Sequence, residues 1–276
     1  MALIEPPLQA FTLADGRRLT WQEFGAPDGK PVLYFHGGGS CSLEAGIFHR
    51  EAMRDNVRLI ATNRPGAAGS SVFPGRPVAA YSDDLVELLE HLRIGEFACA
   101  GESNGGLVAL AVAFKLAARV VGAVPINPTV PWFDPVARRV SPCSAGIAYR
   151  LIRYWPGLVT ALAGSPARRQ KSDLVGPPPG TEPDVAEFQW RVMDQAAKEA
   201  LAPELKWASS NWGFDYYSIP VKLDFFCGVH DAQAPFALVL ADRNPDARFH
   251  YFSYGHYGFS HPQARRRIFD RIAGYF

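Results

Sequence analysis

The chain is poor in the features that mark secreted, metal-bound and membrane-embedded proteins. Its 276 residues hold only four cysteines, and the spacing of Cys41, Cys99, Cys143 and Cys227 fits neither a disulfide framework nor a zinc site. No stretch reaches the run of about 18 apolar residues that a spanning helix needs. The first ten residues lack a basic region followed by an apolar run, as a signal peptide would have. We therefore expect a cytoplasmic protein with no metal and no membrane partner.

An excess of charge is also missing. The 28 Lys and Arg residues against 27 Asp and Glu residues give a formal net charge of +1, so a nucleic-acid partner is not indicated. The chain has no dinucleotide fingerprint and no phosphate-binding Gly-Lys-Ser/Thr, so we expect no cofactor. The hydrophobic content of 48% is ample for a sizeable core. The length suits one large domain, or one domain that carries an insertion.

Strand and helix patterns alternate through the first half of the chain and again near its end. Short apolar runs typical of buried strands alternate with segments whose apolar residues recur at helical spacing. Such alternation predicts a mostly parallel sheet with helices on both faces. The expected strands are 17–24, 32–35, 57–61, 97–100, 120–126, 221–227 and 248–252, and the expected helices are 81–92, 104–118, 235–243 and 262–275.

The alternation stops between residues 128 and 219. This stretch has many prolines, helical fragments near 145–154 and 184–201, and no convincing buried strand. A structureless loop of that length inside a compact domain is improbable. We therefore expect a core made of residues 1–127 and 220–276, with a helical cap over residues 128–219. The run Arg265-Arg266-Arg267 in the last helix is expected on a solvated face.

The stretch Gly101-Glu102-Ser103-Asn104-Gly105-Gly106 lies between an expected strand and an expected helix. A glycine two residues on either side of Ser103 permits a turn too tight for any Cβ. This is the pattern of a nucleophile elbow, which holds a serine hydroxyl exposed above the sheet. Ser103 is therefore the candidate nucleophile.

A serine needs a base, and the base needs an orienting carboxylate. His256 follows the last expected strand at the carboxyl edge of the sheet, where ligands bind in such folds, and is the candidate base. His261 is the alternative. Asp231 follows the preceding strand at the same edge and is the candidate acid, with Asp134 as a fallback. His36 is expected to brace the glycine-rich loop that follows it.

The negative charge that develops on a substrate oxygen needs preorganised donors. The backbone N–H of Asn104, directly after the nucleophile, is one candidate. The loop Gly37-Gly38-Gly39 offers the other, with Gly38 as the donor and Gly37 against the substrate. Its consecutive glycines let the backbone approach a ligand closely.

Taken together, these motifs resemble those of α/β-hydrolase-fold proteins along nearly the whole chain. The resemblance rests on residues 36–39, 63–66, 101–106, 228–231 and 255–256. Asn63 stands where the family usually has aspartate, a departure expected to leave the chemistry intact. The resemblance, strongest to small bacterial esterases, implies an eight-stranded type of sheet and a serine hydrolase with the triad Ser103, Asp231 and His256.

We predict cleavage of a carboxylic ester or lactone in a hydrophobic small molecule. Aromatic residues are frequent in the cap segment, and Trp132 and Trp212 are the best candidates for contacting an apolar substrate. Two alternatives stay open: a carbon–carbon bond hydrolase with the same triad, and a non-hydrolytic binding protein or cyclase on the same fold. The sequence fixes neither the physiological substrate nor the oligomeric state.

Overall fold

The computed structural model describes residues 3–155, 157–158 and 177–276. Eight strands form one sheet in the order β1-β2-β4-β3-β5-β6-β7-β8. β2 pairs antiparallel with β1 and β4, and the remaining neighbours are parallel. The strands are β1 (Gln9–Thr12), β2 (Arg18–Gly25), β3 (Lys30–Phe35), β4 (Val57–Thr62), β5 (Phe97–Glu102), β6 (Val120–Ile126), β7 (Leu223–Gly228) and β8 (Ala247–Phe252). The predicted mostly parallel eight-stranded sheet is confirmed.

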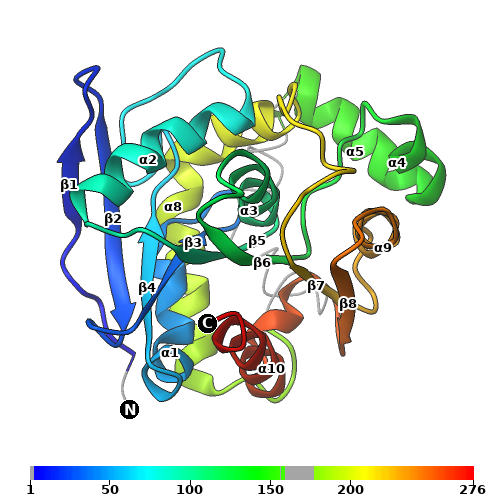
Figure 1. Cartoon of the computed structure of the whole chain (residues 1–276). Helices are drawn as coiled ribbons and strands as arrows, with labels where there is room; N and C mark the ends of the chain where they lie inside the picture. The colour runs from blue at the N-terminus through cyan, green and yellow to red at the C-terminus, as the bar shows by residue number, and fades with distance from the viewer. Residues whose placement is uncertain (1–2, 156, 159–176) are drawn as a thin grey trace.

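Helices cover both faces of the sheet, also as predicted (Figure 1). One hydrophobic core lies under α2 (Tyr81–His91), α3 (Asn104–Lys115) and α9 (Ala234–Arg243). The second lies under α1 (His49–Arg54), α10 (Pro262–Ala273) and the 3-10 turn η1 (Ser42–Phe48). The shorter 3-10 turns are η2 (Val78–Ala80) and η3 (His256–Ser260).

Between β6 and β7 the described residues form α4 (Pro135–Val140), α5 (Cys143–Tyr154) and α8 (Pro183–Ala208). The first turns of α8 pack into the second core through Val185, Phe188 and Val192. The expected helix over 184–201 is therefore present but runs to Ala208, through Pro203. A proline inside a helix normally favours an end of the helix at that point. Here the next residue, Glu204, contacts Gly39 and Arg64, and these tertiary contacts outweigh the local preference.

Two other details differ from expectation. β1 was not anticipated, because four residues at a sheet edge are too short for a reliable alternation. The expectation that the three consecutive arginines share a solvated face is wrong for Arg265. Its guanidinium is 1% exposed and is paired with Glu51 at 3.0 Å and Glu182 at 2.7 Å, while Arg266 and Arg267 are exposed. These two carboxylates compensate the buried charge.

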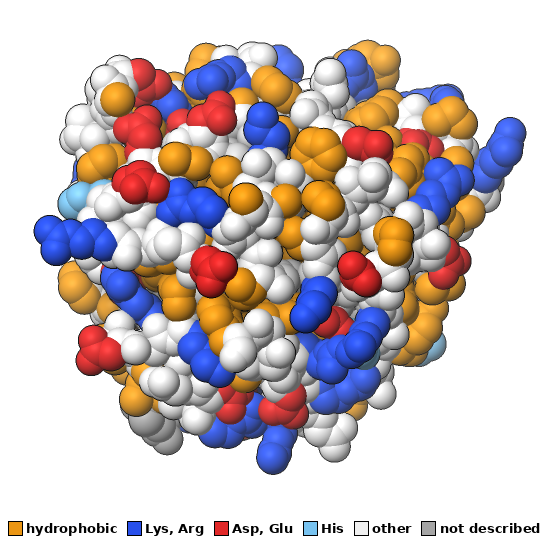
Figure 2. Space-filling model, viewed as in Figure 1, with side chains coloured by type: hydrophobic (Ala, Val, Ile, Leu, Met, Phe, Trp, Pro, Cys, Tyr) orange, Lys and Arg blue, Asp and Glu red, His pale blue; other side chains and the backbone are white. Residues whose placement is uncertain are grey.

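The molecular surface mixes charges of both signs. On the face shown in Figure 2, basic and acidic side chains are interspersed among apolar ones. Within the part of the chain that the structure describes, no helix has the length and apolar character needed to cross a membrane.

Candidate active site

Ser103 stands at the apex of a sharp turn between β5 and α3. Its backbone has φ 53° and ψ −114°, a left-handed conformation that costs a non-glycine residue about 1–3 kcal/mol. The turn is held at both ends, because Ser103 N–H donates to Ile126 O at 2.8 Å and Thr129 N–H donates to Ser103 O at 3.1 Å. Such strain persists only where the surroundings enforce it, and here it leaves the serine half-buried above the sheet.

The two glycines that flank the serine are required by close backbone approach. A Cβ at Gly101 would lie 2.3 Å from Gly105 O, and a Cβ at Gly105 would lie 1.8 Å from Phe35 O. Both distances are shorter than any real contact, so only glycine fits. The backbones of β5, α3 and β3 therefore approach one another as closely as the glycine pattern around Ser103 predicts.

Asp231 and His256 meet at the carboxyl edge of the sheet, from the ends of β7 and β8. Asp231 Oδ2 lies 2.5 Å from His256 Nδ1. The other carboxylate oxygen accepts the Gln233 N–H at 2.8 Å, which fixes the orientation of the acid. Asn127, at the end of β6, donates to His256 O at 2.6 Å and accepts from Gly228 N–H at 2.9 Å. Asn127 thus joins the histidine loop to the end of β7.

The second ring nitrogen of His256 faces a carboxylate as well. His256 Nε2 lies 2.8 Å from Glu102 Oε1, and no hydrogen bond between Ser103 and His256 is described in this structure. Burial alone would lower the pKa of His256, but the attraction of Asp231 and Glu102 outweighs it and raises that pKa well above 6.5. Both carboxylate contacts therefore favour the protonated form of the ring.

The alternative base and acid are engaged elsewhere. His261 Nδ1 accepts the Gln263 N–H at 3.3 Å and caps α10. Asp134 caps α4 through Val136 N–H at 2.6 Å, and also accepts the hydroxyls of Tyr216 and Tyr217 at 2.8 and 2.9 Å. Both side chains therefore have structural roles at helix starts.

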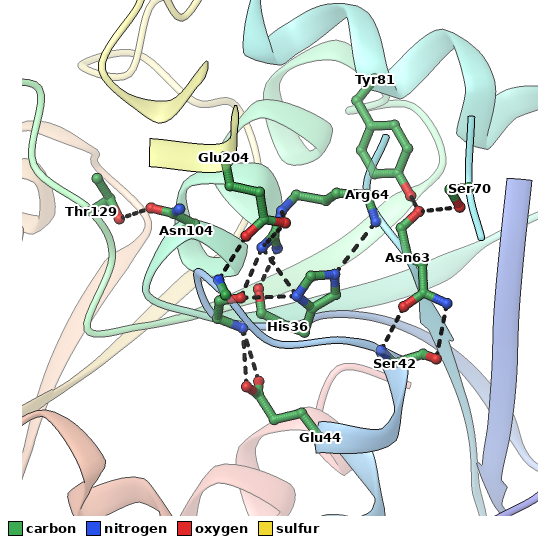
Figure 3. A network of polar contacts seen from close by, with 12 residues as sticks. His36, Ser42, Glu44, Asn63, Arg64, Ser70, Tyr81, Asn104, Thr129 and Glu204 are labelled. Atoms are coloured by element: carbon green, nitrogen blue, oxygen red, sulfur yellow. Dashed lines mark hydrogen bonds and ion pairs between the residues drawn. The ribbon is translucent and has the colours of Figure 1, made fainter. Parts of the chain in front are cut away.

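The residues that carry the two proposed oxyanion donors, Gly38 and Asn104, are neighbours in the structure. Asn104 is the first residue of α3, so its backbone N–H belongs to the first turn, which has no intrahelical acceptor. A Cβ at Gly38 would lie 2.8 Å from Asn104 Nδ2, so the loop after β3 rests directly against this residue. Asn104 Oδ1 accepts the Thr129 hydroxyl at 2.7 Å, which fixes the side chain (Figure 3). The oxyanion role of the two backbone amides stays a prediction.

Arg64 and Glu204 tie this glycine-rich loop to helix α8 (Figure 3). Glu204 accepts Gly39 N–H at 2.7 Å and pairs with the Arg64 guanidinium at 2.8 Å. Arg64 in turn donates to the backbone carbonyls of His36 and Gly37. His36 is fully buried and contacts the loop and Arg64, in agreement with its expected bracing role. The loop is thus held by a buried ion pair.

The side-chain amide of Asn63 has hydrogen-bond partners for both its oxygen and its nitrogen. Its Nδ2 donates to Thr20 Oγ1 and Ser42 Oγ, both at 3.0 Å, and its Oδ1 accepts Ser42 N–H at 2.7 Å. Those hydroxyls donate onward to Ala68 O and Gln22 Oε1. An acid at this position could not supply the two donors.

The two tryptophans differ in their surroundings. Trp132 is half-buried and lines a cavity of about 620 Å³ together with Phe133, Arg138 and Arg150. Trp212 is 1% exposed, donates its indole N–H to Ala208 O at 2.9 Å and packs edge-on against Phe133. The described lining of the cavity does not include Ser103.

Sequence reasoning missed three site residues: Glu102, Asn127 and Glu204. Glu102 lies inside the elbow motif, where any residue satisfies the pattern. Asn127 directly follows a buried strand, a position at which a polar residue could have been noticed. Glu204 gave no signal, because its partners are far away in the sequence, Arg64 by 140 positions and Gly39 by 165. Among the described residues, no group of three or more His, Cys, Asp or Glu side chains is placed to hold a metal ion.

Residues 32–268 match the family model described as the alpha/beta hydrolase family. The chain belongs to the alpha/beta hydrolase family. The segment that matches curated relatives spans about a quarter to a third of their own length. A dihydrolipoyllysine-residue acetyltransferase component of an acetoin cleaving system from Pseudomonas putida is 36% identical over 99 residues, which is 36% of this chain and 26% of that protein. A proline iminopeptidase from Arabidopsis thaliana is 30% identical over 118 residues, which is 41% of this chain and 30% of that protein.

Solved structures of related fold align along almost the whole of this alpha/beta hydrolase. A thermophilic esterase from Thermogutta terrifontis has a TM-score of 0.69 at 23% identity, covering 98% of this chain and 97% of that one. Epoxide hydrolase A from Mycobacterium thermoresistibile has a TM-score of 0.73 at 17% identity, covering 99% and 98%. At these identities the likeness shows the fold, while membership of the family supports a hydrolytic enzyme.

Proposed function

We propose that this alpha/beta hydrolase cleaves a carboxylic ester or lactone of a hydrophobic small molecule through Ser103, His256 and Asp231. The observation that carries the proposal is the combination of a strained serine at the start of α3 with the contact between Asp231 and the half-buried His256 at the same sheet edge. Strain of this kind concentrates at functional sites. No other described histidine has an acidic partner at this edge.

The reaction follows from the roles of these groups. Once His256 is neutral, Nε2 takes the Ser103 hydroxyl proton as Oγ attacks the substrate carbonyl. The amides of Gly38 and Asn104 receive the negative charge on the carbonyl oxygen, and each such donor is worth about 3 kcal/mol. His256 then returns the proton to the leaving oxygen, and water resolves the acyl-enzyme by the same path.

The remaining parts of the proposal concern the substrate. We assign residues 1–127 and 220–276 to a core that sets the reaction type, and residues 128–219 to a cap that sets the limits on the substrate. The contact of Trp132 with an apolar substrate is part of this proposal, supported by the frequency of aromatic residues in the cap segment. The contact of Gly37 with a substrate is also part of this proposal.

The nucleophile is tested by Ser103→Ala, which we expect to lower kcat on p-nitrophenyl esters by on the order of 10⁴-fold or more. It should also abolish labelling by a fluorophosphonate. Ser253→Ala, at an exposed position in the loop before His256, is the matched control and should retain both. Near-full turnover by the Ser103→Ala protein would show that this serine is not the nucleophile.

A further inference from the structure

The imidazole of His256 has a carboxylate at each of its two nitrogens. Asp231 Oδ2 lies 2.5 Å from Nδ1, and Glu102 Oε1 lies 2.8 Å from Nε2. The first contact is the orienting one that a catalytic histidine needs. The second is at the atom that must accept the Ser103 proton in the proposed reaction. Glu102 therefore occupies the place at the base that the serine needs.

The surroundings of Glu102 direct its carboxylate toward the histidine. The residue ends β5, directly before Ser103, and its side chain is 3% exposed. Its Oε2 closes against Gly37, where an added Cβ would lie only 2.1 Å away. No described residue gives Oε1 an aligned hydrogen bond, so the close partner of that oxygen is His256 Nε2. A buried carboxylate oxygen without a hydrogen bond is costly unless a cation compensates it.

We propose that Glu102 is a positioning residue for His256, whose carboxylate holds Nε2 of the protonated imidazole and so competes with Ser103 for the base. The inference rests on the proposed serine-hydrolase function. Glu102 is then a second acidic residue beside the triad, and it opposes the active state of His256, whereas Asp231 assists it. The enzyme is thereby set to gain its base at higher pH than an ordinary histidine would allow.

The protonation states explain the competition. The imidazolium carries a proton on each nitrogen, and a carboxylate oxygen lies 2.5 Å from Nδ1 and 2.8 Å from Nε2, which agrees with the raised pKa of His256. When the Nε2–H bond breaks, the proton leaves to water and the electron pair stays on Nε2. That lone pair then faces the Glu102 oxygen unfavourably and turns to the Ser103 hydroxyl as its donor. Deprotonation thus moves the histidine from Glu102 to the serine.

Other titratable groups surround the pair. Glu44, from η1, also lies against Gly37 and accepts hydrogen bonds from Gly37 N–H at 3.0 Å and Tyr34 Oη at 2.7 Å. Burial and then repulsion from Glu102 raise the pKa of Glu44 to about 7. Burial raises the pKa of Tyr34 in this group and the charge of Arg64 opposes that rise, while Asp231 lies at the other nitrogen of the His256 ring. Glu44 has no contact with the histidine ring, which makes it the natural control.

The test compares Glu102→Gln with Glu44→Gln. The His256 ring is titrated by NMR, and kcat/KM for p-nitrophenyl acetate is measured against pH. In Glu102→Gln the NMR midpoint and the acid limb of kcat/KM should both move to lower pH by about one pH unit or more, the size of shift that one adjacent charge produces. Activity well below the wild-type midpoint should rise about tenfold for each pH unit of that shift. Glu44→Gln should move the midpoint less.

A merely structural role for Glu102 predicts a different result, namely activity lowered at every pH with an unchanged midpoint, and this would overturn the proposal. Equal shifts in the two variants would also overturn it, because the general field of the acidic cluster would then explain them. If Glu102→Gln fails to fold, Glu102→Asp replaces it. This variant keeps the charge on a shorter side chain, and its His256 midpoint should lie between that of the wild type and the value expected for Glu102→Gln. If the wild type neither hydrolyses esters nor reacts with fluorophosphonate, the proposed function fails, while the NMR titration still decides the Glu102–His256 contact.

Discussion

The Arg64–Glu204 pair offers a quantitative test of how helix α8 supports the glycine-rich loop. Their side chains are 1% and 3% exposed, and they meet at 2.8 Å. Glu204→Ala would remove the counter-charge and also free the Gly39 N–H, leaving the Arg64 guanidinium buried with the carbonyls of His36 and Gly37 as its remaining acceptors. An uncompensated buried charge is far more costly than the loss of a surface ion pair.

Removing one partner of a buried pair costs about 3–5 kcal/mol. Because Arg64 keeps its backbone acceptors, we expect the lower part of that range. At about 2–4 °C per kcal/mol for a large domain, the melting temperature should fall by roughly 10 °C. The double variant Arg64→Met/Glu204→Leu removes both charges and should regain most of the lost stability. Activity should stay low in both variants, because the loop loses the contacts that hold it.

Denaturant unfolding of the wild type, of the single variants Arg64→Met and Glu204→Leu, and of the double variant gives the coupling free energy of the pair. A coupling of 1 kcal/mol or more is expected for a buried pair in contact. A value below about 0.5 kcal/mol, the additivity found for distant sites, would refute the reasoning. Full ester hydrolysis by a stably folded double variant would show that the tie to α8 does not position the loop.

The remaining predictions concern the base, the replaced aspartate and the two tryptophans. His256→Ala should abolish fluorophosphonate labelling, while His261→Ala should leave most of it, and the opposite pattern would move the base to His261. Because the pKa of His256 is raised, kcat/KM should rise with pH through a midpoint above 6.5. Asn63→Asp should lower the free energy of unfolding by about 1–3 kcal/mol, since two buried hydroxyls lose their donor, whereas unchanged denaturant midpoints would contradict the assigned hydrogen bonds. Trp132→Ala should change kcat/KM unequally across a chain-length series of esters, by about 1–3 kcal/mol for substrates that contacted it, and uniform losses would remove it from the pocket. Trp212→Ala should lower the melting temperature, because the indole is buried, and an unchanged value would show that its packing is dispensable.

Much of the fold and the centre of the candidate site could be predicted from the sequence, because they depend on short-range patterns. The tight turn at Ser103 needs glycines at two neighbouring positions, and those positions can be identified by eye. Parallel strands separated by helices bring their carboxyl ends to one edge, so Asp231 and His256 could be placed together without a structure. The sequence did not predict the edge strand β1, because four alternating residues are too few for a reliable pattern, or the last turns of α8, because a proline inside a helix suggests that the helix ends there.

The sequence by itself determined the order of strands and helices, the strained turn at Ser103 and the meeting of Asp231 with His256, since each follows from residues that are neighbours in the chain or end a strand. The tertiary structure alone decided which other charges meet at the site. Glu102 and His256 are 154 positions apart, and Arg64 and Glu204 are 140 apart. No periodicity joins such pairs, because their contact depends on how whole elements pack. Burial then removes the water that would screen these charges, and this strengthens the contacts that Glu102 makes with His256 and that Glu204 makes with Arg64.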